Sequence, residues 1–167
     1  MVLFTMFGVL MFLSDILFEF IPNVHGVALF ICVVTLVYRW RAIIPVAIYV
    51  MITAVSSLLT GYTLWWIPYT YIFPILWLLV MLIPKKAPLR VKIVLSSVFM
   101  GLHGLAFGTL YAPFQMIMYD LSLEATLTWI ALGFPFDLLH MVGNIAMSVL
   151  VYPIYRLLLK LDSKRPK

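Results

Sequence analysis

Charged residues are scarce in this chain, and their scarcity excludes an ordinary soluble domain. Only 10% of the 167 residues are charged, whereas 65% are hydrophobic. Soluble domains average about 25% charged and about 45–50% apolar residues. The net charge of +5 does not indicate a nucleic-acid binder, because the basic residues interrupt long apolar runs instead of clustering on a solvated face. We therefore expect an integral membrane protein with no nucleic-acid partner.

Cysteine and the common catalytic motifs are also nearly absent. The single cysteine, Cys32, excludes an intrachain disulfide and any metal or iron–sulfur site built from the cysteines of one chain. The chain has no G-x-x-x-x-G-K-[ST] phosphate loop, no G-x-S-x-G motif and no H-E-x-x-H motif. We therefore expect neither an enzyme nor a resident cofactor, and the energy for any transport must come from a partner or an ion gradient.

Long apolar stretches fill most of the chain. A span needs about 20 apolar residues, because the bilayer core is about 30 Å thick and a helix rises about 1.5 Å per residue. The N-terminal stretch lacks the basic start and cleavage site of a signal peptide, so we expect it to be a retained helix. Proline, glycine and charged separators divide the chain into six expected spans, Leu3–Phe20, Val24–Tyr38, Ala42–Thr60, Tyr69–Ile83, Ile93–Tyr119 and Phe136–Leu159.

The separators and the charges together predict an architecture. Pro135 is expected to end a short interfacial helix over 123–133, before the last span begins. All eleven Lys and Arg follow the second, fourth and sixth spans, and cytoplasmic loops carry such an excess. The sequence thus predicts an all-α, polytopic bundle of six transmembrane helices with cytoplasmic N and C termini. It forms a single domain over 1–160, followed by a short basic tail over 161–167.

The strongest polar signal lies in the last span. Asp137, His140, Asn144 and Ser148 recur at spacings of three and four residues, so they share one stripe of a helix. Ionisable groups in a membrane must face the bundle interior. We interpret Asp137, His140 and Asn144 as the wall of a ligand site, with interhelical hydrogen bonding as the alternative. For Ser148 we favour packing.

Two acidic residues and a histidine lie near the first connection. Asp15 and Glu19 stand four residues apart on one helix face, where no Lys or Arg is expected to pair with them. Glu19 either contributes to a site or reaches the membrane interface. His25 either covers a pocket or is a solvated loop histidine.

Aromatic residues crowd the connection over 61–71. Trp and Tyr favour membrane interfaces, which explains much of this enrichment. A rigid aromatic edge can also stack on a planar or cationic ligand. We therefore interpret Trp65, Trp66 and Tyr69 as a ligand lid, and Tyr71 less so.

The fifth span combines small and polar residues. Gly104 and Gly108 form a G-x-x-x-G pair, which indicates close helix packing. Tyr111 and Gln115 continue the same face outward, where they are in reach of a ligand. His103 lies near the membrane midplane, either as a proton-coupling site or as a packed histidine, and we favour packing.

The six expected spans, the basic tail and four segments carry a family resemblance. The segments are SDILFEFIPNVHG, WWIPYTY, LHGLAFGTLYAPFQ and, most specifically, GFPFDLLHMVGN. They resemble the substrate-binding S component of an energy-coupling factor (ECF) transporter over nearly the whole chain. The resemblance implies a bacterial plasma-membrane protein that captures a vitamin or related micronutrient and docks on a transmembrane coupling protein with two cytoplasmic ATPases. It implies as ligand-facing residues Asn23, His25, Trp65, Trp66, Tyr69, Gln115, Asp137, His140 and Asn144.

The first helix departs from the family pattern. Many S components carry alanines at four-residue spacing on this helix, where they pack against the coupling protein. Here it offers only Gly8 and Ser14 as small residues beyond Thr5. Coupling through the third span, with Ala47, Ala54 and Ser57, is the alternative.

Charge indicates the class of ligand. Five carboxylates flank the expected site, and the outer connections hold no Lys or Arg to clamp an anion. We therefore expect a neutral or cationic micronutrient. Two other functions stay open: a stand-alone proton-coupled carrier that uses His103, Asp15 and Asp137, and a non-transporting membrane scaffold.

Overall fold

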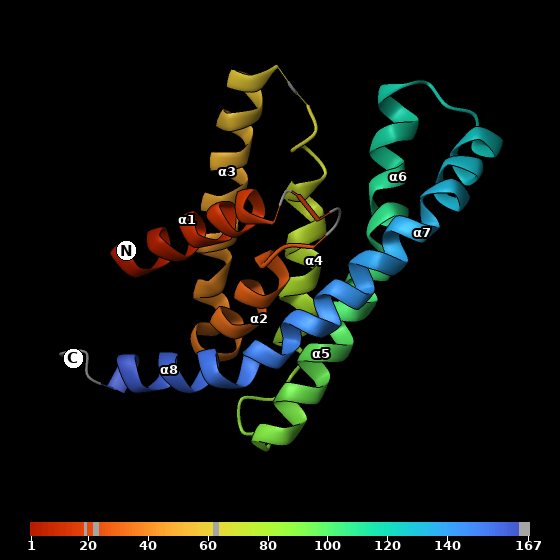
Figure 1. The fold of residues 1–167 in the computed structure, drawn as a ribbon. Helices are drawn as coiled ribbons and strands as arrows, with labels where there is room; N and C mark the ends of the chain where they lie inside the picture. The colour runs from red at the N-terminus through yellow and green to blue at the C-terminus, as the bar shows by residue number, and fades with distance from the viewer. Residues whose placement is uncertain (19, 22–23, 62–63, 164–167) are drawn as a thin grey trace.

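The chain folds entirely into helices in the part that is described. The computed structural model describes residues 1–18, 20–21, 24–61 and 64–163, and this part contains no strand. The turns η1 (Arg39–Ala42) and η2 (Ser148–Leu150) accompany eight α-helices (Figure 1): α1 (Val2–Leu17), α2 (Val27–Tyr38), α3 (Ile43–Thr60), α4 (Tyr69–Met81), α5 (Leu89–Leu105), α6 (Phe107–Met118), α7 (Leu123–Met147) and α8 (Val151–Ser163).

The helices are those of a membrane protein. Three continuous helical stretches, Val27–Thr60, Leu89–Met118 and Leu123–Ser163, are long and apolar enough to cross a membrane, and α1 and α4 are shorter apolar helices. The first of these stretches turns back on itself at η1, so that α2 and α3 run in opposite directions (Figure 1). The all-α prediction is confirmed, whereas the count of six spans and the side of the termini stay predictions.

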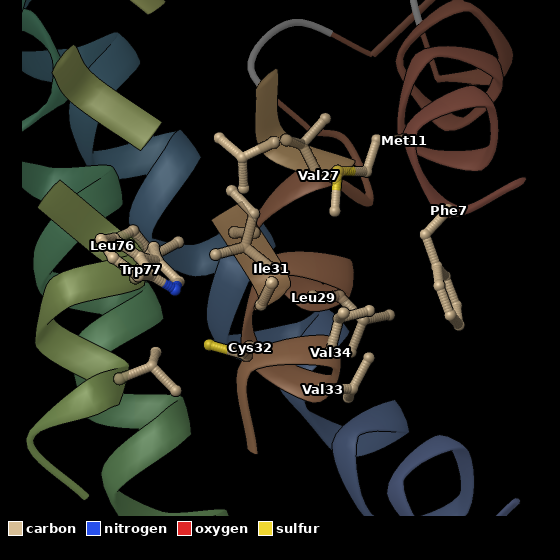
Figure 2. Close-up of a cluster of buried hydrophobic side chains, with 14 of the residues drawn as sticks. Phe7, Met11, Val27, Leu29, Ile31, Cys32, Val33, Val34, Leu76 and Trp77 are labelled. Carbon is tan, nitrogen blue, oxygen red and sulfur yellow. The ribbon is translucent and has the colours of Figure 1, made fainter. Parts of the chain in front are cut away.

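The centre of the core is α2. This helix is apolar on every side, and such a helix is stable only when it is surrounded. It contacts α1, α4, α5 and α8. Figure 2 shows its side chains between Phe7 and Met11 of α1 on one side and Leu76 and Trp77 of α4 on the other.

The expected break at Pro135 is wrong. Helix α7 runs without interruption through Pro135, just as α4 and α6 contain Pro74 and Pro113. Proline removes one hydrogen bond of a helix, but membrane helices tolerate it because their neighbours and local adjustments compensate the freed carbonyl. The change of direction comes at η2 instead, where α8 leaves the path of α7 (Figure 1). The last expected span, Phe136–Leu159, is therefore divided between α7 and α8.

Arg39, which directly follows α2, is hydrogen-bonded to the C-terminal end of α4. Its Nη1 donates to the Ile83 carbonyl at 2.9 Å, and its Nη2 donates to the Met81 carbonyl at 2.6 Å. The Arg39 carbonyl in turn accepts from Trp77 Nε1 at 3.3 Å. Carbonyls at a helix C-terminus have no partner within the helix and attract cations. Arg39 therefore ties two helices together where α4 ends.

Glycines bring the helix backbones into close approach. A Cβ on Gly104 would lie 2.9 Å from the His140 carbonyl carbon and 2.9 Å from the Met141 amide nitrogen, so α5 and α7 touch through their backbones. On the other side of the molecule, a Cβ on Gly8 would lie 2.5 Å from Ile48 Cγ2 and so obstruct the contact of α1 with α3. The contact of α5 with α7 and that of α1 with α3 therefore each require a glycine, Gly104 and Gly8 respectively.

Gly104→Ala is expected to lower the free energy of unfolding by about 1–3 kcal/mol, because the new methyl group meets backbone atoms that cannot move aside. The matched control is Gly133→Ala in α7, where a Cβ meets nothing within 4 Å. This control is expected to gain about 0.5–1 kcal/mol from helix propensity. Unfolding in mixed micelles, followed by circular dichroism, measures both. Equal effects of the two variants would contradict close packing at Gly104.

Candidate functional site

Aromatic and imidazole rings from six parts of the chain meet inside the bundle. They come from the connection between α1 and α2 and from α3, α4, α5, α6 and α7. We refer to them as the ring cluster, which comprises His25, Tyr49, Tyr69, Phe73, His103, Phe107 and His140.

Phe73 and Phe107 each contact several other rings of the ring cluster. The Phe73 ring centroid lies 5.0 Å from that of Tyr69 and 5.3 Å from that of Tyr49. The Phe107 centroid lies 4.8 Å from that of His140 and 6.0 Å from that of His103. Edge-to-face and tilted rings at these separations attract one another. The cluster is therefore a packed aromatic lining rather than a set of separate side chains.

His25 and His140 face each other within this lining. Their ring centroids are 4.8 Å apart, and His140 is only 2% exposed. Among the described residues, Nδ1 of His25 and Nε2 of His140 are buried without a hydrogen-bond partner. A buried polar atom that lacks a partner costs about 1–3 kcal/mol, and such atoms are uncommon enough to require an explanation. This pair is the most unusual feature of the interior.

His103 has a different environment. Its Nε2 lies 3.0 Å from the carbonyl oxygen of Ile72 on α4. A carbonyl only accepts, so Nε2 carries the proton and Nδ1, which is buried without a partner, is an acceptor. The bond joins α5 to α4, as the packing interpretation of this residue requires.

The surroundings of His25 favour its neutral form. It lies in the connection between α1 and α2, outside the helices. Burial lowers the pKa of His25 from its ordinary value, and the Asp15 carboxylate only partly opposes this shift. A neutral imidazole has one donor and one acceptor nitrogen, so His25 offers a ligand one hydrogen bond without a charge.

Asp15 closes one edge of the ring cluster. Tyr49 Oη donates to its Oδ2 at 2.8 Å, which links α3 to α1. The Tyr49 ring also stacks on the Tyr69 ring with a centroid separation of 6.4 Å. The carboxylate of the first helix, which the sequence left without an expected partner, therefore has a phenol as its partner.

Asp137 caps a helix from outside. Its Oδ1 accepts from the Gly108 amide at 2.9 Å. Gly108 is the second residue of α6, where amide groups have no partner within the helix. A Cβ on Gly108 would lie 2.6 Å from Oδ2 of Asp137, so glycine makes room for the carboxylate. Asp137 thus has a structural role next to the ring cluster, in addition to any contact with a ligand.

Asp137→Ala is expected to lower the free energy of unfolding by about 0.5–2 kcal/mol, as the loss of a helix cap does. Asp137→Asn keeps an acceptor oxygen for the Gly108 amide and is expected to unfold as the wild type does. Asn removes the negative charge, so it is still expected to weaken the binding of a cationic ligand. Thermal unfolding of both variants separates capping from charge. Equal destabilisation by Ala and Asn would contradict the capping role.

The outer aromatic residues form a second group. Tyr111 Oη donates to the Trp65 carbonyl at 3.0 Å, and its ring stacks on that of Trp129 at a centroid separation of 6.3 Å. Tyr111 also stacks on Phe107 at 6.3 Å, so this group continues the ring cluster. Trp66 lines an apolar groove of about 560 Å³ between α3 and α4 together with Ala47 and Ala54.

The remaining predicted residues lie apart from the ring cluster or outside the described residues. Asn144, 1% exposed, donates through Nδ2 to the Met100 carbonyl at 3.0 Å and joins α7 to α5. Gln115 is buried on α6. Ser148 Oγ donates to Ser97 Oγ, which agrees with packing. Glu19 and Asn23 lie outside the described residues.

Sequence reasoning missed Tyr49, Phe73, Phe107 and Trp129. Phe73 and Phe107 are ordinary apolar residues of apolar helices, so no local signal distinguishes them. Tyr49 is the only tyrosine of its helix, and a buried phenol needs a partner, which is a weak signal.

No protein-family model, curated protein or solved structure matches the chain. Within the described residues, no group of three or more His, Cys, Asp and Glu side chains is placed to hold a metal ion. The functional argument therefore rests on the geometry of the ring cluster.

Proposed function

We propose that this protein is the substrate-capture subunit of an ECF-type importer in a bacterial plasma membrane, and that it binds a neutral or cationic aromatic micronutrient at the ring cluster. The observation that carries the proposal is the pair of unpartnered imidazole nitrogens of His25 and His140 within an aromatic lining. A ligand that satisfies both nitrogens gains hydrogen bonds that no described residue makes to them.

The surroundings of these nitrogens favour a planar ligand without negative charge. Phe73, Phe107 and Tyr69 offer ring faces and edges for stacking. Asp15 and Asp137 flank the rings, whereas none of the contacts described for the ring cluster involves Lys or Arg. An anionic ligand would find no charged clamp there, and a cationic ligand gains from both the carboxylates and the ring faces.

Entry of the ligand requires the rings to separate, because they are in contact with one another. His25 is the member of the ring cluster that lies on a connection rather than within a helix. Displacement of His25 therefore opens the cluster at the smallest cost to the helices. The described Lys and Arg residues lie in η1, in the 84–92 region and in α8, toward one end of the molecule (Figure 1). We assign this end, which carries α8, to the cytoplasm because of the positive-inside rule, and a cytoplasmic N-terminus stays a prediction.

The proposed partners are a transmembrane coupling protein and two cytoplasmic ATPases. The groove between α3 and α4, which includes Ala47 and Ala54, is an apolar surface on which the coupling protein can dock. Gly8 does not serve this purpose alone, because it faces Ile48 in the contact between α1 and α3.

Native mass spectrometry tests the proposal directly. The full chain is purified in mild detergent from bacteria grown in rich medium, with His140→Leu prepared in parallel. We expect a small aromatic molecule to co-purify with the wild-type protein and to be absent from the variant. A molecule retained equally by both would contradict binding at the ring cluster. Uptake by vesicles that contain only this chain, abolished when the proton gradient collapses, would instead establish a stand-alone carrier.

A further inference from the structure

Helix α8 differs from the other helices in its distribution of charge. Val151, Tyr155 and Leu158 are buried against the rest of the protein. Arg156 and Lys160 are exposed and stand four residues apart, so they lie one above the other on a single face. Exposed apolar residues flank this charged face, namely Tyr152, Leu157, Leu159 and Leu161.

The position of α8 matches this pattern. Figure 1 shows the helix turning away from α7 and running across the end of the bundle, past the turn between α2 and α3. Lys92 at the start of α5 holds it there, since Lys92 Nζ donates to Tyr155 Oη at 3.0 Å and lies 5.3 Å from the Tyr155 ring centroid. The exposed side of α8 combines two cations with apolar side chains and lies across the end of a membrane bundle, and this combination is typical of a helix in the plane of the membrane surface.

The side chains of the charged face of α8 leave an open gap between them. An open depression of about 520 Å³ is lined by Arg156, Leu157, Leu159 and Lys160. Two cations next to two leucines match the chemistry of a phospholipid, in which a phosphate adjoins acyl chains. Arginine binds phosphate through two parallel hydrogen bonds, and basic residues at the surface of a membrane attract anionic lipids.

We propose that α8 is an in-plane helix whose Arg156 and Lys160 bind the headgroup of an anionic phospholipid, with Leu157 and Leu159 against its acyl chains. The phosphate lies between the guanidinium and the ammonium groups, and the two leucines flank it on opposite sides. The site is independent of the ring cluster and depends only on the membrane setting. Its failure would therefore leave the proposed capture function intact.

The test is a titration of phosphatidylglycerol into the full chain in a zwitterionic detergent. Native mass spectrometry counts the bound lipids. R156Q/K160Q is expected to weaken phosphatidylglycerol binding about tenfold to thirtyfold, from about a fivefold contribution of each cation. The matched control is K85Q/K86Q, which removes the same charge from the exposed connection between α4 and α5. R156K/K160R keeps both charges and is expected to retain binding within about threefold.

Each outcome decides the proposal. Loss of phosphatidylglycerol in R156Q/K160Q alone, with weak binding of phosphatidylcholine throughout, supports it. Equal losses in both glutamine variants would indicate attraction by total charge and would overturn it. Unchanged binding in R156Q/K160Q would overturn it as well. Displacement of the lipid by equimolar inorganic phosphate would identify a site for soluble anions, which also contradicts the proposal.

Discussion

His140→Leu is expected to stabilise the protein and to abolish capture of its ligand. Nε2 of His140 is buried without a partner, so leucine of similar volume removes a cost of about 1–3 kcal/mol from the folded state. The same substitution removes a hydrogen bond to the ligand and is expected to weaken binding about 10–100-fold. Mixed-micelle unfolding measures the first effect, and titration of the ligand identified by mass spectrometry measures the second.

The matched control is His103→Leu. His103 Nε2 bonds the Ile72 carbonyl, so its replacement loses a hydrogen bond of about 1 kcal/mol, which offsets part of the gain from removing its own unpartnered Nδ1. His103→Leu is therefore expected to stabilise the protein by about 1 kcal/mol less than His140→Leu does. If the two substitutions change the free energy of unfolding equally, the Nε2 atom of His140 has a structural partner and the functional interpretation is wrong.

Arg39→Ala is expected to have the largest effect on stability, a loss of about 2–5 kcal/mol. Arg39 makes two charged hydrogen bonds to the Met81 and Ile83 carbonyls, and each such bond contributes about 1.5–3 kcal/mol. Their loss leaves the end of α4 without its partner from η1. The change in the free energy of unfolding, followed by circular dichroism in mixed micelles, measures the effect.

Arg41→Ala provides the control, because Arg41 carries the same charge two residues away and is exposed. Its effect is expected to stay within about 0.5 kcal/mol. Arg39→Lys keeps the charge but cannot reach two carbonyls with a planar fork, so we expect an intermediate loss. Equal effects of Arg39→Ala and Arg41→Ala would show that charge near the membrane surface, rather than the link to α4, determines stability.

Short-range spacing predicted part of the candidate site. The stripe of Asp137, His140 and Asn144 faces inward as its spacing indicates, with exposures of 7%, 2% and 1%. Spacing along one helix does not reveal what lies opposite. Asp137 accepts a hydrogen bond from the Gly108 amide, and Asn144 donates one to the Met100 carbonyl. Both partners are backbone groups, which every residue has, so residue identity does not predict them.

Proline shows a second limit of local reasoning. Pro135 lowers the local preference for a helix, and the sequence therefore indicated an end. The helix continues because α7 packs along both α5 and α6, and these contacts outweigh one missing hydrogen bond. The direction changes at η2 instead, which contains Val149, four residues before Pro153 in the first turn of α8; a proline cannot bond the carbonyl four residues earlier.

Composition and spacing alone predicted an all-α fold, its apolar helices and the inward face of its polar stripe, because these properties depend on residues within a few turns of one another. The tertiary structure decided which groups have partners. Arg39 reaches Ile83 across 44 positions, and Asp137 reaches Gly108 across 29. It also brought His25 to His140 and left their nitrogens unpartnered. Contacts at such separations depend on how whole helices pack, and no local pattern of residues encodes them.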